Sequence, residues 1–259
     1  MKDLSIYFEE VVDNNEYAQG QLGAVIESNT VDGFPDLVES GIALVFVPDY
    51  RNGNNAGSGE WIPDFRFAFK RQYAGAWNTP IFDLGTIRPG KSVADTCVAV
   101  KDVVTELVKK QVFPVVIGGG QDLTYAIYQA YEKLEQTINL MAVDHGLDLG
   151  DPEDEISADG WLNKIVLHKP NYLFNFSLFG YQSYLVNPTE IKLLDQNPIL
   201  SQKIIGKEDV SISGLIKKLG NSDWVKSGRH YFDESGNACP FCQQDTEEIK
   251  LKDQLEEYF

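Results

Sequence analysis

The sequence predicts a doubly wound, mostly parallel α/β sheet, and three apolar runs carry this prediction. Residues 41–48 form a continuous apolar run without the alternation of a half-exposed strand, which is typical of a parallel strand covered on both faces. Residues 113–117 read as another buried strand, and residues 138–143 as a further strand. Segments with helical periodicity lie between these runs, at about residues 92–111 and 122–134. Alternating strands and helices of this length favour a parallel sheet. We therefore expect functional side chains at the carboxyl ends of the strands.

The remaining elements follow in order along the chain. A long glycine-rich loop at residues 52–59 follows the first strand, and a short strand is expected at residues 81–85. The helix at 92–111 has Ser92 as its expected N-cap and Asp95 in its first turn. Its apolar residues share one face: Val93, Cys97, Val100, Val104, Leu107 and Val108. After an acidic loop, a helix is expected near residues 160–167 and a strand at residues 172–176.

Composition and charge limit the functional classes. With 259 residues, of which 43% are hydrophobic, the chain is long enough for one large domain, or for a domain and an appendage. The net charge of −17 gives no basic footprint, so we expect neither nucleic acid nor a membrane as a partner. No apolar run is long enough to span a bilayer and no leader is evident, which favours a cytoplasmic protein. Three cysteines argue against a disulfide framework, and Cys97 is expected to be a buried thiol.

Two strand ends carry motifs in an informative order. After the strand at 113–117, residues 118–122 read Gly-Gly-Gly-Gln-Asp, and after the strand at 138–143, residues 144–148 read Asp-His-Gly-Leu-Asp. On these motifs, and over about residues 35–190, the chain resembles the ureohydrolase family, which includes arginase, agmatinase and formimidoylglutamase. The resemblance implies the N-terminal portion of an arginase-type α/β domain. Formimidoylglutamase is the subgroup that the first motif resembles most.

The resemblance implies a hydrolase that acts on C–N bonds of linear amidines, with a small guanidino or formimino compound as substrate. In this family two divalent ions, usually manganese, are held by carboxylates and imidazoles. The ions lower the pKa of a bridging water and present hydroxide to the substrate carbon. The number of ligands therefore decides whether such a site is active.

The chain departs from the family's ligand pattern. Gln121 stands where the first motif has a histidine ligand, and Gly146 stands where the second has one. Asp144 and Asp148 keep two carboxylate positions. The family's third ligand motif, a later strand that ends in Ser-x-Asp-x-Asp, does not occur in this sequence. We therefore expect manganese to bind weakly or not at all, at a vestigial dimetal site, and catalysis to be impaired or lost.

Neighbouring residues have secondary roles in this interpretation. His145 is adjacent to the lost histidine position, but consecutive side chains of an extended strand point to opposite faces, so His145 is expected to point away from the metal. If some activity persists, the two aspartates would anchor one ion, with Gln121 or His145 as a poor third ligand. Asp122 would then support the site from outside the ligand shell.

Simpler interpretations of the same residues stay open. Asp144 and Asp148 could be a helix cap and a solvated loop charge, and the glycines at 118–120 could serve only as a tight turn. His168 and His230 are expected at the surface rather than as ligands.

Residues from about 197 to 259 resemble a different class of protein. The segments 197–200, 205–209, 219–225 and 239–244 are similar, in this order, to part of the large ATPases related to anticodon nucleases and to SMC and Rad50 proteins. Cys239 and Cys242 form a CxxC pair, which is half of a tetrahedral zinc site. In zinc-hook proteins two chains each supply such a pair. The alternative is a reduced CxxC pair without a metal.

These observations divide the chain into two parts and leave more than one functional hypothesis open. Residues 1–193 are interpreted as an incomplete ureohydrolase-like domain, and residues 194–259 as a mainly helical tail that contains the CxxC pair. The first hypothesis is an arginase- or formimidoylglutamase-like hydrolase with impaired or lost catalysis. The alternative is a non-enzymatic interaction or scaffold module that dimerises through zinc at the CxxC pair, and a third hypothesis is a relic without a selected function. A homo-oligomer is expected, since missing later strands would leave a sheet edge open.

Overall fold

The computed structural model describes most of the N-terminal part of the chain and little of the remainder. The described residues are 3–53, 57, 59–76, 78–150, 156–180, 182, 184–187, 190 and 204–205. The chain divides into two compact units, of which the first contains residues 1–138 and 148–172 and the second contains residues 139–147 and 173–259. In the described part of the chain, no helix is long and apolar enough to cross a membrane.

The first unit contains a mostly parallel sheet. Its strands are β1 (Phe8–Glu9), β2 (Glu27–Ser28), β3 (Ile42–Phe46), β4 (Ile81–Ile87) and β5 (Phe113–Ile117). The order is β1-β4-β3-β5, and β2 also pairs with β4. Only the β1–β4 pair is antiparallel among these pairs. The α-helices of this unit are α1 (Ile62–Lys70), α2 (Val93–Lys109), α3 (Leu123–Lys133) and α4 (Trp161–Leu167), and short 3-10 helices occur at Ser5–Tyr7, Leu22–Ala24 and Gly59–Trp61.

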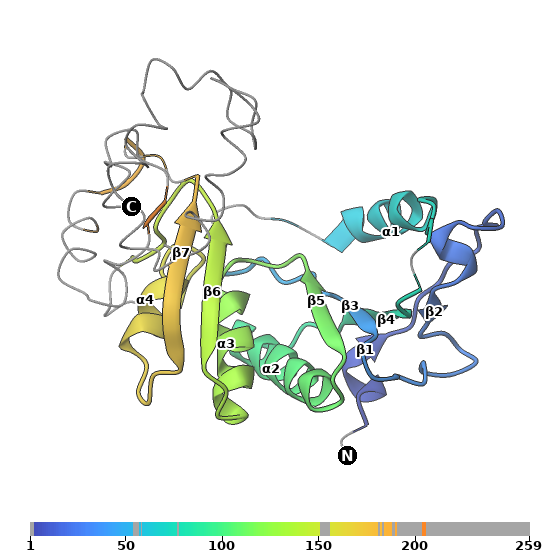
Figure 1. The fold of residues 1–259 in the computed structure, drawn as a ribbon, viewed down its shortest axis with the longest axis horizontal. Coiled ribbons are helices and arrows are strands. Elements are labelled where there is room, and N and C mark those ends of the chain that lie inside the picture. Colours follow the sequence, from blue (N-terminus) through green and yellow to red (C-terminus); the bar gives the residue numbers. More distant parts are fainter. Residues whose placement is uncertain are drawn as a thin grey trace, which may run out of the picture. The chain divides into compact units, whose positions relative to one another are not determined.

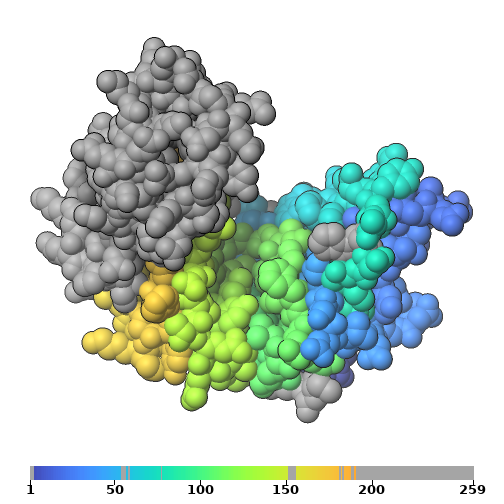
Figure 2. All heavy atoms as spheres, in the orientation of Figure 1, coloured from blue at the N-terminus to red at the C-terminus, as the bar shows by residue number. Residues whose placement is uncertain are grey.

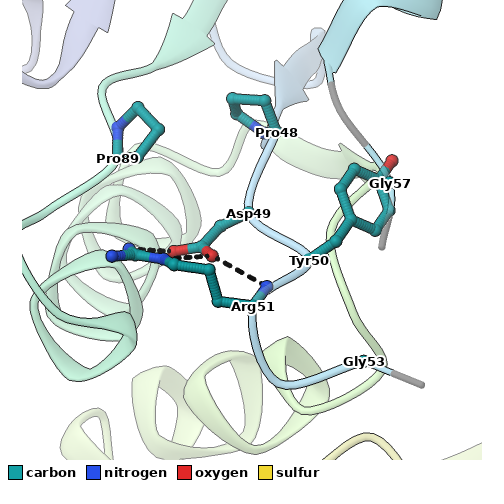
Figure 3. Close-up of a pocket in the computed structure, with 7 residues that line it drawn as sticks. All are labelled: Pro48, Asp49, Tyr50, Arg51, Gly53, Gly57 and Pro89. Carbon is teal, nitrogen blue, oxygen red and sulfur yellow. Dashed lines mark hydrogen bonds and ion pairs between the residues drawn. The ribbon is translucent and has the colours of Figure 1, made fainter. Parts of the chain in front are cut away.

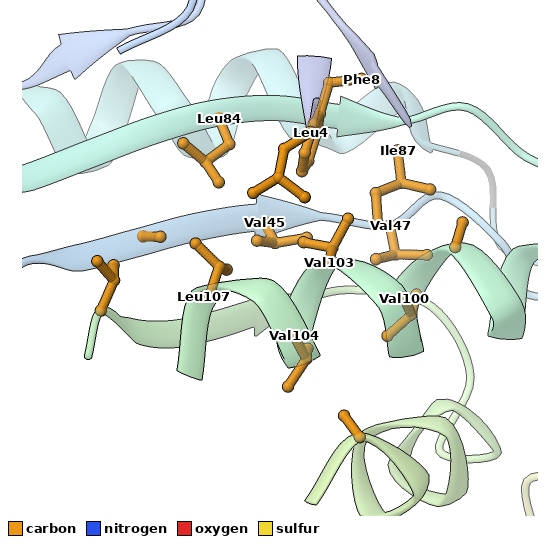
Figure 4. Packing of buried hydrophobic residues seen from close by; sticks show 14 of the residues in the cluster. Leu4, Phe8, Val45, Val47, Leu84, Ile87, Val100, Val103, Val104 and Leu107 are labelled. Carbon is orange, nitrogen blue, oxygen red and sulfur yellow. The ribbon is translucent and has the colours of Figure 1, made fainter. Parts of the chain in front are cut away.

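Different helices cover the two faces of β3, as a continuous apolar strand predicts. Ala43, Val45 and Val47, whose side chains point to one face of the sheet, are fully buried in a cluster with α2 and α3 (Figure 4). Leu44 and Phe46 point to the other face and pack with Ile62 of α1. Figure 1 shows α1 on one side of the sheet and α2 and α3 on the other. The predicted doubly wound, mostly parallel α/β class is therefore confirmed.

Helix α2 begins where the sequence predicts. The Ser92 hydroxyl accepts a hydrogen bond from the Asp95 N–H at 3.2 Å, and the Asp95 carboxylate accepts one from the Ser92 N–H at 2.8 Å. This capping box satisfies amides that the first turn leaves without partners. Cys97, on the same helix, is only partly buried, and burial raises the pKa of its thiol to about 11. A thiol with so high a pKa is a poor nucleophile at neutral pH.

Helix α1 is an element that sequence patterns did not predict. Its residues, Ile-Pro-Asp-Phe-Arg-Phe-Ala-Phe-Lys, alternate apolar and polar side chains over much of their length, which is closer to the period of a strand than of a helix. Phe65 stacks on Phe69 with ring centroids 6.1 Å apart, and Trp61 meets Phe65 edge-on. Phe65 and Phe67 are each 38% exposed. Figure 2 shows the surface of this helix in cyan. Contact with the sheet therefore decides its helical conformation.

A buried group of charged side chains surrounds Asp83 of β4. Its carboxylate is fully buried and accepts hydrogen bonds from Arg66 Nε at 3.0 Å and Nη2 at 3.3 Å. Lys70 Nζ lies 3.6 Å from Asp83 and donates to Asp13 at 3.0 Å. Burial acts to raise the pKa of Asp13, but four hydrogen bonds, one of them from Lys70, lower it to about 2. Two cations and two carboxylates thus neutralise one another inside the first unit.

The second unit contains a smaller sheet. Its strands are β6 (Ile138–Val143, with residues 139–143 in this unit), β7 (Leu173–Phe179) and β8 (Ile204–Ile205), in the order β6-β7-β8. Strands β7 and β8 are parallel. The expected domain boundary at residues 193/194 and the expected helical segments of the tail lie outside the described residues.

Candidate functional site

The turn after β5 contains three glycines, two of which have backbone conformations that other residues rarely adopt. Gly118 and Gly119 have φ angles of +90° and +74°, which L side chains rarely adopt. A Cβ at Gly118 would lie 2.9 Å from the Val47 carbonyl oxygen, and one at Gly119 would overlap the Leu123 side chain. The Gly120 N–H donates to the Asp49 carbonyl at 3.0 Å. The turn thus packs closely against the segment that follows β3. This packing is sufficient to explain why glycines occur here, independently of any function.

Gln121 and Asp122 follow this turn and occupy different environments. Gln121 is exposed, whereas Asp122 is 1% exposed and occupies the N-cap position of α3 without capping it through its side chain. Asp122 Oδ2 accepts a hydrogen bond from Asn52 Nδ2 at 3.3 Å, and Oδ1 is buried without a hydrogen-bond partner. Burial raises the pKa of the Asp122 carboxyl, and the negative charge of Asp49 acts in the same direction. Asp122 is therefore a poorly compensated buried carboxyl at a strand end.

Asn52 connects three segments of the first unit. Its Nδ2 atom donates both to Asp122 and to the Ile156 carbonyl, the latter at 3.0 Å. Its own carbonyl accepts the Ala158 N–H at 3.2 Å. The loop after β3, the start of α3 and the segment at 156–158 are thus held by one side chain and its backbone. Sequence analysis did not single out Asn52, although its place at the start of the glycine-rich loop was a signal.

A pocket of about 460 Å³ lies beside the loop after β3. It is lined by Pro48, Asp49, Tyr50, Arg51, Gly53, Gly57 and Pro89 (Figure 3). Arg51 Nε and Nη2 donate to the buried Asp49 carboxylate at 2.9 and 2.6 Å, and Arg51 also donates to the backbone carbonyls of Gly90 and Lys91. The Arg51 guanidinium holds the pKa of Asp49 below its usual range. This pair is neutral as a whole and fixes the wall of the pocket.

At the end of β6, Asp144 is turned towards its own chain. Its Oδ1 atom accepts hydrogen bonds from the N–H groups of His145 at 2.6 Å and Gly146 at 3.4 Å. The His145 ring reaches the same oxygen through Nδ1 at 3.0 Å, and its side chain is 72% exposed. Gly146 supplies no side chain. In the second unit Asp144 therefore interacts with the next two residues of the motif, His145 and Gly146.

Asp148, in the first unit, is also engaged by protein groups. Its Oδ2 atom accepts a hydrogen bond from Trp161 Nε1 at 2.9 Å. Its φ angle is +50°, an uncommon value for a residue other than glycine. Residues in such conformations are held by the surrounding structure and occur often at functional positions. Sequence analysis did not predict the contact with Trp161.

The donor set does not fit a two-ion centre. Across the residues that the structure describes, no group of three or more His, Cys, Asp or Glu side chains is placed to hold a metal ion. Asp144 and Asp148 belong to different compact units, and Gln121 offers an amide rather than an imidazole. The assignment of the two aspartates as remnants of a metal site stays a prediction. Cys239 and Cys242 lie outside the described residues.

The two histidines expected at the surface have different outcomes. His168 is partly buried, so that prediction is wrong for it: its Nδ1 lies 2.9 Å from the Tyr125 hydroxyl and its Nε2 lies 2.8 Å from Glu132 Oε1. The ring of Tyr128 meets it edge-on. Contacts between α3 and the residue after α4 decided this burial, which no local pattern shows. His230 lies outside the described residues.

Comparison with known families gives two matches. The model of the arginase family matches residues 50–211. A model described as an AAA domain matches residues 180–259, so the two matches overlap over residues 180–211. No curated protein matches the chain.

Solved structures share the fold. A formimidoylglutamase from Bacillus subtilis superimposes with a TM-score of 0.59 and 14% identity, over 85% of this chain and 67% of that one. A formiminoglutamase from Trypanosoma cruzi, solved with Mn²⁺, gives 0.56 and 18%, over 73% of this chain and 65% of that one. An arginase from Medicago truncatula gives 0.54 and 16%, over 64% and 56%. The chain thus spans about two thirds of the length of the first two proteins and less of the third.

Proposed function

Because residues 50–211 place this chain in the arginase family, we propose that it is a relative of the metal-dependent hydrolases of linear amidines in which catalysis is impaired or lost. The observation that carries this proposal is the state of the second strand-end motif. Asp144 accepts hydrogen bonds from the N–H groups of His145 and Gly146, Gly146 brings no ligand, and Asp148 accepts the indole N–H of Trp161. Nothing in this arrangement favours the generation of a metal-bound hydroxide.

The structural neighbours indicate the substrates to test first. Formimidoylglutamase and formiminoglutamase share the fold at TM-scores of 0.59 and 0.56. Their names point to formimino compounds, and the presence of Mn²⁺ in the second structure points to manganese as the ion to add. Guanidino compounds follow from the arginase of Medicago truncatula.

The experiment is an assay of the purified full chain with added Mn²⁺ on formimino and guanidino compounds. Release of formamide and urea is measured, with the Trypanosoma cruzi formiminoglutamase as a positive control. We expect turnover at least ~10³-fold below the control, because a metal-activated nucleophile accounts for several kcal/mol of barrier lowering. Turnover near that of the control would contradict the proposal, and its loss in a folded Asp144→Asn, Asp148→Asn double variant would assign it to the mapped site.

A gain-of-function variant sharpens the test. Gln121→His and Gly146→His together return imidazoles to the two positions where the family has them. If the chain keeps the family's architecture at these positions, the double variant should bind Mn²⁺ more tightly than the parent in a metal-binding titration. Equal binding by parent and variant would show that the two strand ends do not form a shared site.

A second candidate function is that of an interaction module. The AAA-domain match over residues 180–259 favours it, because this segment contains Cys239 and Cys242 and extends beyond the arginase match. Zinc shared by two chains would give half an equivalent per chain and a homodimer, both lost in a Cys239→Ser, Cys242→Ser variant. A metal-free monomer that is unchanged by this variant would exclude this function. The net charge of −17 supports the further proposal that neither nucleic acid nor a membrane is a partner.

A further inference from the structure

Helix α4 begins without a cap of its own. Its N-cap residue is Gly160, which has no side chain to accept a hydrogen bond, and its first turn contains no acidic residue. The first N–H groups of a helix need acceptors from elsewhere. The backbone carbonyl of Asp148, 13 residues before Trp161, accepts one of them, the Leu162 N–H, at 3.3 Å, and the Asp148 carboxylate accepts the side-chain N–H of Trp161, Nε1, at 2.9 Å.

The surroundings of this contact are closely packed. Trp161 and Leu162 are 4% and 0% exposed, and Leu149, next to Asp148, is 2% exposed. Gly150 approaches Gly160 so closely that a Cβ on Gly150 would lie 2.9 Å from the Gly160 Cα. The segment that carries Asp148 is thus packed directly against the start of α4.

We infer that Asp148 is a structural anchor, which holds the start of α4 through Trp161 and Leu162 without any metal ion. The inference rests on the proposed function, because it gives a structural role to a position where the resembled family carries a metal ligand. The physical reason is that Trp161 is buried, so its indole N–H needs an acceptor within the protein. A carboxylate also accepts a hydrogen bond more strongly than a neutral oxygen does.

The first test compares the thermal stability of variants of the full chain. Asp148→Ala removes the acceptor and should lower the melting temperature by roughly 4–10 °C, whereas Asp148→Asn keeps an oxygen that can accept the indole N–H and should lose less than about half as much. Trp161→Phe removes the N–H and also part of the buried indole ring, so it loses packing as well. The loss in the Asp148→Ala, Trp161→Phe double variant should be smaller than the sum of the two single losses, because both variants remove the same hydrogen bond.

Asp36→Asn is the matched control, because Asp36 is exposed and its replacement also removes one negative charge. If Asp148→Ala melts at the temperature of this control, Asp148 is not an anchor. If Asp148→Ala does not fold, a double-mutant cycle of Asp148→Asn and Trp161→Phe decides: a loss in the double variant that is clearly smaller than the sum of the single losses supports the inference, and additive losses overturn it.

The second test separates an anchor from a metal ligand. With 1 mM Mn²⁺ or with EDTA, the parent chain should melt within about 1 °C of its temperature in buffer, since ligand binding to the folded state raises this temperature. A rise with Mn²⁺ that disappears in Asp148→Asn would overturn the inference. The turnover assay is a separate readout: amidine hydrolysis would contradict the proposed function, whereas only these melting temperatures test the anchor.

Discussion

The carboxylates of Asp83, inside β4, and Asp122, after β5, are both buried in the first unit, but the protein stabilises them differently. Asp83 receives two hydrogen bonds from Arg66 and lies 3.6 Å from Lys70. Asp122 accepts a 3.3 Å hydrogen bond from the uncharged amide of Asn52, and its Oδ1 atom is buried without a hydrogen-bond partner. Asp83 is thus part of a balanced charge cluster, whereas Asp122 carries an uncompensated desolvation cost.

Asp83 therefore has a structural role, whereas the sequence places Asp122 in a strand-end motif. Sequences that fold well satisfy their buried polar groups, and exceptions gather where function requires them. Asp122 lies in the first of the two strand-end motifs, where the resembled family places its metal site. The neighbouring Gln121 has an amide side chain at the position where the resemblance implies an imidazole. The two positions should therefore respond in opposite ways to substitution.

The largest effect is expected from Asp83→Ala. It leaves Arg66 and Lys70 without their shared buried partner, so the free energy of unfolding should fall by about 3–5 kcal/mol. Urea denaturation measures this loss, with the exposed Glu39→Gln as a control for the removed charge. A loss below about 1 kcal/mol would mean that the cluster around Asp83 does not stabilise the fold.

The second prediction concerns the pH dependence that Asp13 adds to the same cluster. Its pKa in the folded protein is about 2, below the ordinary value of 3.8. Stability from this group is therefore present above about pH 4 and is lost as the pH falls through 2, and it amounts to about 2 kcal/mol. The free energy of unfolding measured between pH 5 and 2 should decline less in Asp13→Asn, and less in Lys70→Met, than in the parent. Identical pH profiles would contradict this prediction.

A smaller and more local effect is expected from Asn52→Ala. The variant removes the hydrogen bonds to Asp122 and to the Ile156 carbonyl, so stability should fall by about 1–2 kcal/mol. Amide hydrogen exchange around residues 156–158 should become faster, because Asn52 holds this segment. The exposed Asn14→Ala serves as the control. Unchanged exchange in this segment would show that Asn52 does not hold it.

The smallest effect is expected from Asp122→Asn. The amide has the same shape and no charge to desolvate, so the free energy of unfolding at neutral pH should stay within about 1 kcal/mol of the parent or rise. Asp83→Asn, measured alongside by the same urea titration, should lose clearly more because it weakens the ion pairs with Arg66 and Lys70. Equal losses in the two variants would remove the distinction between the two sites.

Most of the main strands and helices of the described part were predictable because their signals are local. The continuous apolar runs at β3 and β5 indicated parallel strands, the mostly apolar segment at β6 indicated a strand, and Ser92 with Asp95 marked the start of α2. Helix α1 was not predictable, since its phenylalanines recur at the spacing of a strand. Its helical form depends on packing against Leu44 and Phe46, which are distant in sequence.

In the candidate site, too, some features were predictable from local sequence and others were not. Local sequence was enough to find the two strand-end motifs and to show that Gln121 and Gly146 bring no imidazole, because ligand chemistry depends on residue identity. The roles of the remaining aspartates depended on partners far along the chain: Asn52 for Asp122, 70 residues away, and Trp161 for Asp148, 13 residues away. Tertiary packing determines such partners, because it brings donors to carboxylates that lie far from them in the sequence. The sequence by itself thus determined the fold class and the missing ligands, and only the tertiary structure decided that Asp148 contacts Trp161 and that Asp122 lacks a full set of partners.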